Sequence, residues 1–169
     1  MVHLEKGNLI KIKHKVTVLG TGNILRSDDG LGVFVVDELK QKKWPPGLLL
    51  LETGTSTLNF LGKISRSYQV IVIDAVRVGG EPGSIYRFIM EDVRDNSPGG
   101  GFRNMHDFFV PDVIRLARSM TGLPAHTVIF GMEPQDLAPG IGLTPAVEKA
   151  LPKIVNMITR EIMENLLGK

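Results

Sequence analysis

Two adjacent aspartates follow a glycine-rich turn near the start of the chain, in the stretch LGTGNILRSDDGLG at residues 19–32. A glycine-rich turn that leads into a helix commonly holds a phosphate on the backbone amides of the helix N-terminus. Here Asp28 and Asp29 occupy that end, and two carboxylates repel an anion. Leu25 also stands where a dinucleotide fingerprint has its third glycine. The stretch therefore favours a cation as ligand. One of the two aspartates is expected to be the N-cap of the following helix, which leaves the other for a different role.

A third aspartate, Asp74, ends the apolar run VIVI at residues 70–73. A carboxylate at the end of a buried strand is costly unless it is paired, hydrogen-bonded or placed at a solvent cleft. Asp29 likewise follows a predicted strand. The carboxyl ends of parallel strands form the ligand crevice of open α/β sheets, and neighbouring strands lie roughly 4.8 Å apart. Asp29 and Asp74 are therefore expected to converge on one ion. The alternative for Asp74 is a structural role as cap of the next turn.

Four histidines are available, at positions 3, 14, 106 and 126. His106 follows a glycine-rich loop and begins a predicted helix, and a loop that delivers an imidazole to a cleft is a common functional arrangement. The alternative for His106 is a solvated surface residue. Together with Asp29 and Asp74 it would give an O,O,N ligand set for a borderline divalent ion such as nickel or zinc. The spacing does not choose between these metals.

Composition narrows the classes of function. The 169 residues carry a net charge of +2 and include no cysteine. So small a charge gives no strong field for steering toward nucleic acid, and a chain without cysteine has no disulfide, thiolate metal site or cysteine nucleophile. No run of about 20 apolar residues predicts a membrane span, and the N-terminus shows no export signal. We expect a cytoplasmic protein that binds neither nucleic acid nor a membrane.

The elements that must position these side chains alternate along the sequence. Apolar runs rich in β-branched residues predict strands, and apolar residues at helical spacing predict helices. The expected strands are 16–20, 48–52, 70–76, 84–89 and 125–132, and the expected helices are 30–41, 55–66, 106–120 and 144–167.

This order predicts an α/β fold. We expect a three-layer sandwich in which a twisted, mostly parallel five-stranded sheet with one antiparallel strand lies between helices on both faces. The strand at 84–89 is expected to run antiparallel to the strand before it, because the connection is too short for a crossover. We expect a single domain over residues 1–169, with residues 1–15 as a candidate N-terminal extension. Apolar residues at 9, 10 and 12 form either an extra edge strand or a loose tail.

Several segments, taken together in order and spacing, resemble the hydrogenase maturation endopeptidases. The combination G-x-G-N-x-L-x-x-D-[DE]-x-x-G, followed by D-A and a loop histidine, is highly specific, although no single piece is. The resemblance covers nearly the whole chain apart from residues 1–15. The segments are GTGNILRSDDGLGV at 20–33, ETGTSTLNFLG at 52–62, VIVIDAV at 70–76, MHDFFVPDVI at 105–114 and GMEPQDLAPGIGLTPAVEKAL at 131–151.

The resemblance implies an activity. Such enzymes cut a short C-terminal extension from the large-subunit precursor of [NiFe]-hydrogenase after the nickel–iron centre has been inserted. The metal-contacting residues of the family map onto Asp29, Asp74 and His106, the same three residues that the sequence singles out by itself. The resemblance thus implies that these three are the catalytic and metal-contacting residues, that the precursor supplies the nickel, and that the chain holds no tight cofactor of its own. A monomer is sufficient for this task.

One segment departs from the family pattern. Where the family often has D-G-G-T after the second strand, this chain has Glu52, Thr53, Gly54 and Thr55. Glutamate reaches one methylene further than aspartate, and a threonine in place of glycine restricts the backbone to negative φ. The shape of this wall of the cleft is therefore expected to differ, and Glu52 and Thr55 are candidates to support the metal-contacting residues.

The sequence leaves two chemical roles for nickel open. Nickel either polarises the scissile carbonyl or activates water, or it is a recognition tag beside which Asp29 or Asp74 acts as general base. Three other functions also stay open. They are a metallopeptidase with its own tightly held metal, a non-catalytic nickel-delivery or assembly factor for the same precursor, and a nucleotide-binding module.

Overall fold

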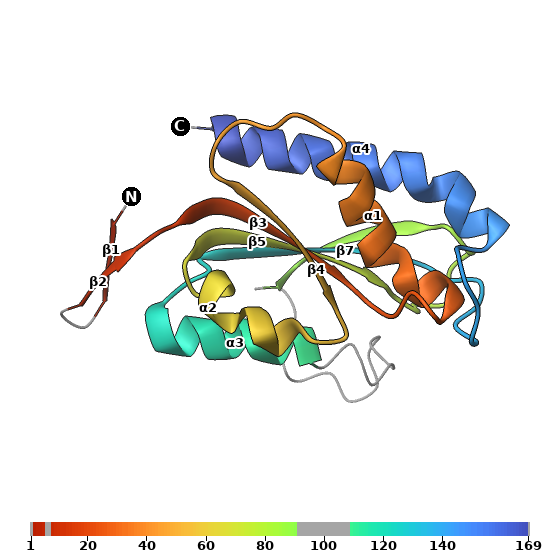
Figure 1. Cartoon of the computed structure of the whole chain (residues 1–169), viewed down its shortest axis with the longest axis horizontal. Coiled ribbons are helices and arrows are strands. Elements are labelled where there is room, and N and C mark those ends of the chain that lie inside the picture. The colour runs from red at the N-terminus through yellow and green to blue at the C-terminus, as the bar shows by residue number, and fades with distance from the viewer. Residues whose placement is uncertain (1, 6–7, 91–108, 169) are drawn as a thin grey trace.

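The computed structural model describes residues 2–5, 8–90 and 109–168 (Figure 1). Its strands are β1 Val2–Glu5, β2 Asn8–Lys11, β3 His14–Thr21, β4 Leu48–Gly54, β5 Ser67–Ala75, β6 Ile85–Ile89 and β7 His126–Met132. Its α-helices are α1 Leu31–Lys40, α2 Leu61–Ile64, α3 Phe109–Thr121 and α4 Pro145–Leu167, and its 3₁₀ helices are η1 Ser27–Gly30 and η2 Thr57–Phe60.

The main sheet has five strands in the order β4-β3-β5-β7-β6. The first four run parallel to one another, and β6 pairs antiparallel with β7. Helices α1 and α4 cover one face of this sheet, and α2 and α3 cover the other (Figure 1). The predicted fold class, a mostly parallel five-stranded sheet with one antiparallel strand between helices on both faces, is confirmed.

The position of β6 refines one prediction. Its direction, antiparallel to β5, is as expected, but β6 does not pair with β5, because β7 lies between them. A short connection determines the direction of the next strand, but it does not determine which strand that next strand pairs with. Here residues 76–84 are long enough to pass over one strand position, and β7 returns from α3 to fill it.

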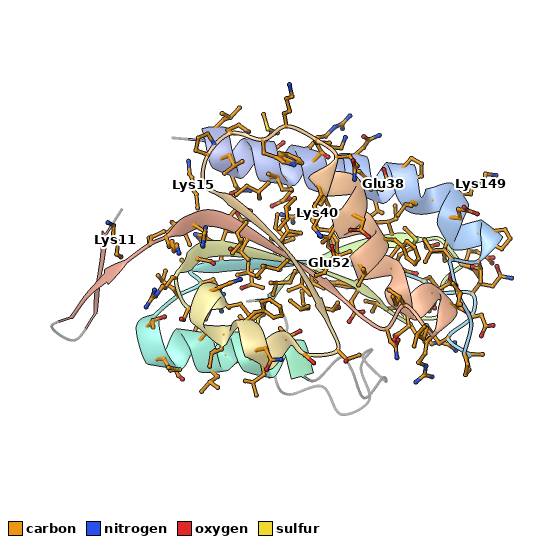
Figure 2. The ribbon with its side chains drawn as sticks, in the orientation of Figure 1. Lys11, Lys15, Glu38, Lys40, Glu52 and Lys149 are labelled. Atoms are coloured by element: carbon orange, nitrogen blue, oxygen red, sulfur yellow. The ribbon has the colours of Figure 1, made fainter. Side chains whose placement is uncertain are left out.

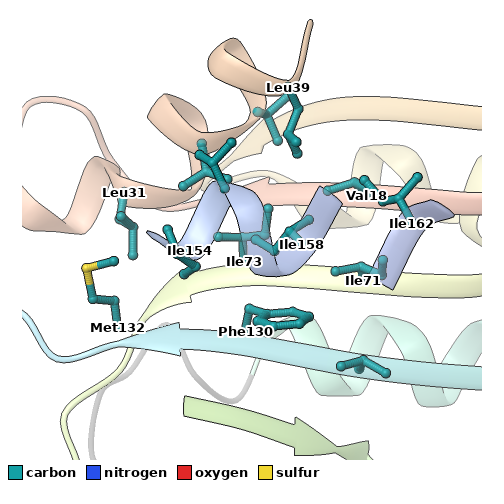
Figure 3. Close-up of a cluster of buried hydrophobic side chains, with 14 of the residues drawn as sticks. Val18, Leu31, Leu39, Ile71, Ile73, Phe130, Met132, Ile154, Ile158 and Ile162 are labelled. Atoms are coloured by element: carbon teal, nitrogen blue, oxygen red, sulfur yellow. The ribbon is translucent and has the colours of Figure 1, made fainter. Parts of the chain in front are cut away.

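Alternation along the central strands produces two hydrophobic cores, because successive side chains of a strand point to opposite faces of the sheet. Ile71 and Ile73 pack with α1 and α4, whereas Val70 and Val72 pack with α2 and α3. Figure 3 shows the first of these cores, with Phe130 of β7 among the side chains beneath α4. These strands are buried on both faces, which explains why they read as continuous apolar runs.

The segment at 55–66 is less regular than predicted. Its residues form η2 followed by the single turn of α2 rather than one long helix. The predicted helix at 106–120 corresponds to α3. The first three residues of the prediction, 106–108, lie outside the described part of the chain. No helix within the described residues is long and apolar enough to cross a membrane.

The N-terminal strands stand apart from the main sheet. Strands β1 and β2 pair antiparallel with each other, and the ribbon they form projects from the body of the protein (Figure 1). Of the two sequence expectations for this region, an extra edge strand of the sheet or a loose tail, neither describes this separate hairpin.

Candidate functional site

Asp29 lies in the 3₁₀ helix η1, between the end of β3 and the start of α1. Its side chain is 7% exposed, and its Oδ2 accepts a hydrogen bond of 3.0 Å from the backbone amide of Asn23. Gly22 makes this turn possible, because its φ is +107° and a Cβ there would lie 1.7 Å from the carbonyl oxygen of Asp29. The glycine-rich turn therefore wraps around the backbone of Asp29.

Asp28 is not the N-cap of α1, and neither is Asp29. The N-cap is Gly30, which makes no side-chain capping hydrogen bond, because the chain forms η1 before α1 begins. The Asp28 carboxylate is fully buried and turns instead toward the connection between β7 and α4. It accepts hydrogen bonds from the amides of Gln135, Asp136 and Thr144 at 2.8, 3.0 and 2.7 Å, and from the Thr144 hydroxyl at 2.9 Å.

Asp74 is the penultimate residue of β5 and is 8% exposed. Its Oδ1 accepts a hydrogen bond of 2.9 Å from the amide of the next residue, Ala75. In the register of the sheet, Asp74 stands opposite Gly131 of the neighbouring strand β7. The carboxylate thus belongs to the carboxyl edge of the parallel sheet and is anchored to the backbone at the strand end.

The elements that carry Asp29 and Asp74 meet at this edge. Strands β3 and β5 are parallel neighbours, and η1 packs against β5. The Thr21 hydroxyl donates 3.0 Å to the carbonyl of Ile73, the residue before Asp74. A Cβ at Gly32 would lie 2.4 Å from that same carbonyl, so the first turn of α1 also touches the end of β5. The structure therefore places both aspartates at one edge of the sheet, as the expected strand arrangement requires.

His106 lies outside the described residues. Within the described part of the chain, no three His, Asp or Glu side chains group closely enough to hold a metal ion. The described residues thus supply two of the three expected ligands, and a metal role for Asp29, Asp74 and His106 stays a prediction.

Glu133 is a buried carboxylate that the sequence reasoning did not single out. It follows β7 directly, just as Asp74 closes β5, and it is 5% exposed. It accepts hydrogen bonds from the amides of Val78 and Gly79 at 2.9 and 3.2 Å, and from the Tyr86 hydroxyl at 3.2 Å. Asp74 was singled out because it is an acid directly after an apolar run. The segment VIFGME at 128–133 has the same pattern, and the acid that follows its apolar run is Glu133.

The hydrogen bonds keep Glu133 ionised. Burial by itself raises the pKa of this carboxyl, but the backbone amides of Val78, Gly80 and Gly79 and the Tyr86 hydroxyl outweigh burial and bring the pKa below its ordinary value. The same contact acts on the phenol in the opposite sense, since burial and the nearby carboxylate raise the pKa of Tyr86. Glu133 therefore holds the 76–84 connection, which leaves the sheet just after Asp74, as a charged acceptor.

In the segment at 52–55, which departs from the family pattern, Glu52 and Thr53 make different contacts. Glu52 forms an ion pair with Lys40 at the end of α1, on the α1 face of the sheet (Figure 2). Thr53 is buried, and its hydroxyl lies 3.3 Å from the carbonyl of Gly20 and 3.2 Å from the Thr57 hydroxyl. The positive φ of this segment falls on Gly54, so Thr53 keeps a negative φ as expected. Thr53, rather than Glu52, contacts the glycine-rich turn.

The structure is an α/β fold with two buried aspartates at the carboxyl edge of its parallel strands, the edge where open α/β sheets bind their ligands. Residues 33–161 match the HycI family, described as hydrogenase maturation protease. The Hydrogenase 2 maturation protease of Escherichia coli is 30% identical over 156 residues, which cover 89% of this chain and 92% of that protein. The Coenzyme F420 hydrogenase subunit delta of Methanothermobacter thermautotrophicus is 31% identical over 157 residues, which cover 88% and 94%.

Solved structures agree with the sequence comparisons. The hydrogenase maturating endopeptidase HybD from E. coli superposes with a TM-score of 0.76 at 29% identity and covers 88% of this chain and 92% of its own. A HycI maturation protease from Thermococcus kodakarensis, at 23% identity, has the same fold with a TM-score of 0.69. The chain belongs to the hydrogenase maturation protease family and is a peptidase.

Proposed function

We propose that this protein removes a C-terminal extension from the large-subunit precursor of a [NiFe]-hydrogenase once the precursor carries nickel. Asp29, Asp74 and His106 recognise that nickel and form the catalytic site. The observation that carries the proposal is the placement of two buried aspartates at the carboxyl edge of the parallel sheet, Asp74 at the end of β5 and Asp29 in η1, which packs against β5, in a chain of the hydrogenase maturation protease family. We also propose that the protein works in the cytoplasm and as a monomer.

The donor set fits nickel that is presented by another protein. Two carboxylates and one imidazole suit a borderline divalent ion, and three ligands leave coordination positions for groups of the precursor. We propose that the chain binds free metal only weakly, because three ligands leave the remaining coordination positions unfilled until the precursor is present. Weak binding of free metal makes cleavage conditional on a loaded precursor, so an empty precursor is spared.

We propose separate tasks for the two aspartates. Asp29 is held by the Asn23 amide and by the glycine-rich turn around its backbone, so its orientation is fixed before substrate arrives. Asp74 accepts from the Ala75 amide through Oδ1. We propose that Asp29 orients the precursor through its nickel, and that Asp74, besides facing the nickel, takes the proton from the water that attacks the scissile carbonyl. Nickel in the precursor stabilises the charge that develops on the carbonyl oxygen.

Trimming of purified, nickel-loaded precursor tests this function. The wild-type chain should shorten the precursor, and Asp74→Asn and His106→Ala should each reduce the rate by a factor of 10³ or more, about 4 kcal/mol of transition-state stabilisation. Circular dichroism should show that both variants stay folded. Asp37→Asn, an exposed aspartate on α1, is the matched control and should trim normally. A precursor that binds the chain but keeps its full mass would instead identify a nickel-delivery factor.

A further inference from the structure

Exposed apolar side chains gather on two loops beside the site. Leu25, in the turn after β3, is 62% exposed, and Ile141, in the connection between β7 and α4, is 91% exposed. Ile24 next to Leu25 is 47% exposed. We call these three side chains the apolar rim. Isolated exposed apolar residues are ordinary on protein surfaces, whereas adjacent ones commonly mark an interaction site.

Backbone hydrogen bonds join the two loops, although they are more than a hundred residues apart in sequence. The Gly140 amide donates 3.0 Å to the Leu25 carbonyl, and the Ser27 amide donates 2.9 Å to the Gly140 carbonyl. A Cβ at Gly140 would lie 2.4 Å from the Ser27 Oγ, so the loops are in direct contact. In Figure 1 the connection that carries Ile141 accordingly lies beside the start of α1. The loops that carry Leu25 and Ile141 are therefore held against each other.

Hydrogen bonds hold the backbone of both loops in place. The Leu25 amide donates 2.9 Å to the Asn23 side-chain oxygen, and the Asn23 amide in turn holds Asp29. On the other side, the buried Asp28 carboxylate binds the amides on both flanks of Ile141, at Asp136 and Thr144. A preorganised apolar surface loses little conformational entropy on binding, which is the property that a docking surface needs.

We propose that the apolar rim docks an apolar segment of the hydrogenase precursor. This inference rests on the proposed function. Its occupant follows from continuity, because Ile24 and Leu25 belong to the same turn that wraps Asp29, so a polypeptide that brings its nickel to Asp29 covers the rim as well. The rim contributes ground-state binding and touches no reacting group, so it sets KM and not kcat.

Steady-state trimming of the nickel-loaded precursor from the same organism tests the rim. Leu25→Gln and Ile141→Gln should each raise KM about tenfold, and kcat should change less than about twofold. The matched control is Leu167→Gln. Leu167 is 63% exposed and ends α4, whose last turn lies against Lys15 at the opposite edge of the sheet. This variant should keep the wild-type KM.

The outcomes separate the two proposals. If wild-type protein trims the precursor and the double variant Leu25→Gln/Ile141→Gln keeps the wild-type KM, the docking surface is refuted and the function stands. If wild-type protein leaves the loaded precursor untrimmed, both are refuted. If wild type sediments as a dimer that the double variant loses, the rim is a self-association surface, and the docking proposal is overturned.

Discussion

At the scale of single residues, two of the buried acids at the carboxyl edge hold loops in place. Asp28 ties η1 to the connection before α4, and Glu133 ties the 76–84 connection to the end of β7. Asp29 accepts from the Asn23 amide and Asp74 from the Ala75 amide, and the catalytic task of these two acids is part of the proposed function.

Asp28→Asn should destabilise the fold. The carboxylate accepts bonds from three amides and one hydroxyl, but a carboxamide has one acceptor oxygen and places an NH₂ group against backbone donors. We expect a loss of about 2–4 kcal/mol in the free energy of unfolding, measured by urea denaturation. Asp37→Asn, on the exposed face of α1, should change it by less than about 0.5 kcal/mol. An unchanged urea midpoint for Asp28→Asn would contradict the proposal that the Asp28 carboxylate stabilises the fold.

Glu133 should make stability depend on pH in the acid range. Its pKa in the folded protein is below its ordinary value of 4.5, so the stabilisation is fully present above that value and is lost as the pH falls through the folded pKa. The difference in unfolding free energy between wild type and Glu133→Gln should therefore shrink as the pH is lowered from 6 toward about 3. A difference that stays constant across this range would contradict the assignment. Exposed Glu148→Gln is the control for the loss of one charge.

The sequence identified only part of these residue roles. The sequence singled out Asp74, and could have singled out Glu133, because each is an acid directly after an apolar run, and the role of Asp74 stays a prediction. The role of Asp28 could not be predicted from the sequence. The groups that donate hydrogen bonds to its carboxylate lie 107 to 116 residues further along the chain, and no local sequence pattern indicates them. The N-cap expectation failed for the same reason, since a tertiary contact took the side chain that local preference had assigned to α1.

At the scale of elements, the site depends on how closely α1 approaches the ends of β3 and β5. Gly20 and Gly32 allow that approach, because a Cβ at Gly20 would lie 2.2 Å from the Gly32 carbonyl oxygen, and one at Gly32 would lie 2.4 Å from the Thr21 backbone and the Ile73 carbonyl. The glycines of the motif thus serve helix–sheet packing. They resemble those of a nucleotide-binding turn because both arrangements need a backbone without side chains at the contact.

Gly32→Ala should displace α1 and disturb the site. Backbone atoms surround the position, so no side chain can move aside, and we expect a loss of about 3 kcal/mol in unfolding free energy together with reduced trimming. The matched control is Gly62→Ala in α2, where an added Cβ meets nothing within 4 Å. That substitution should be neutral or stabilise by up to about 1 kcal/mol, because alanine is the better helix former. Equal effects of the two substitutions in thermal or urea unfolding would contradict the packing argument.

The elements themselves were largely predictable, for a physical reason. Strands buried on both faces read as continuous β-branched runs, and the order of strands and helices restricts the topology to few choices. The pairing of β6 was not predictable from its own neighbourhood, because β7, which comes later in the chain, occupies the position beside β5. The single turn of α2 was also missed, since a short apolar stretch at helical spacing does not report where the turn becomes 3₁₀.

At the scale of the whole molecule, the proposed function makes this protein an enzyme whose site is completed by its substrate. The described residues bring two acids to one edge of the sheet, beside the exposed side chains of the apolar rim, and in the proposed function the nickel belongs to the precursor. Metal analysis of purified wild-type protein should therefore find well below one nickel per chain. Stoichiometric, tightly held metal would instead support a self-sufficient metallopeptidase.

The most direct test is the intact mass of the precursor after incubation with this protein. A nickel-loaded large-subunit precursor should lose its C-terminal extension in the presence of wild-type protein and keep it in the presence of Asp74→Asn, and the same precursor without nickel should stay intact with both. Equal trimming of loaded and nickel-free precursor, or full trimming by Asp74→Asn, would contradict nickel-dependent cleavage at the carboxyl edge of the sheet.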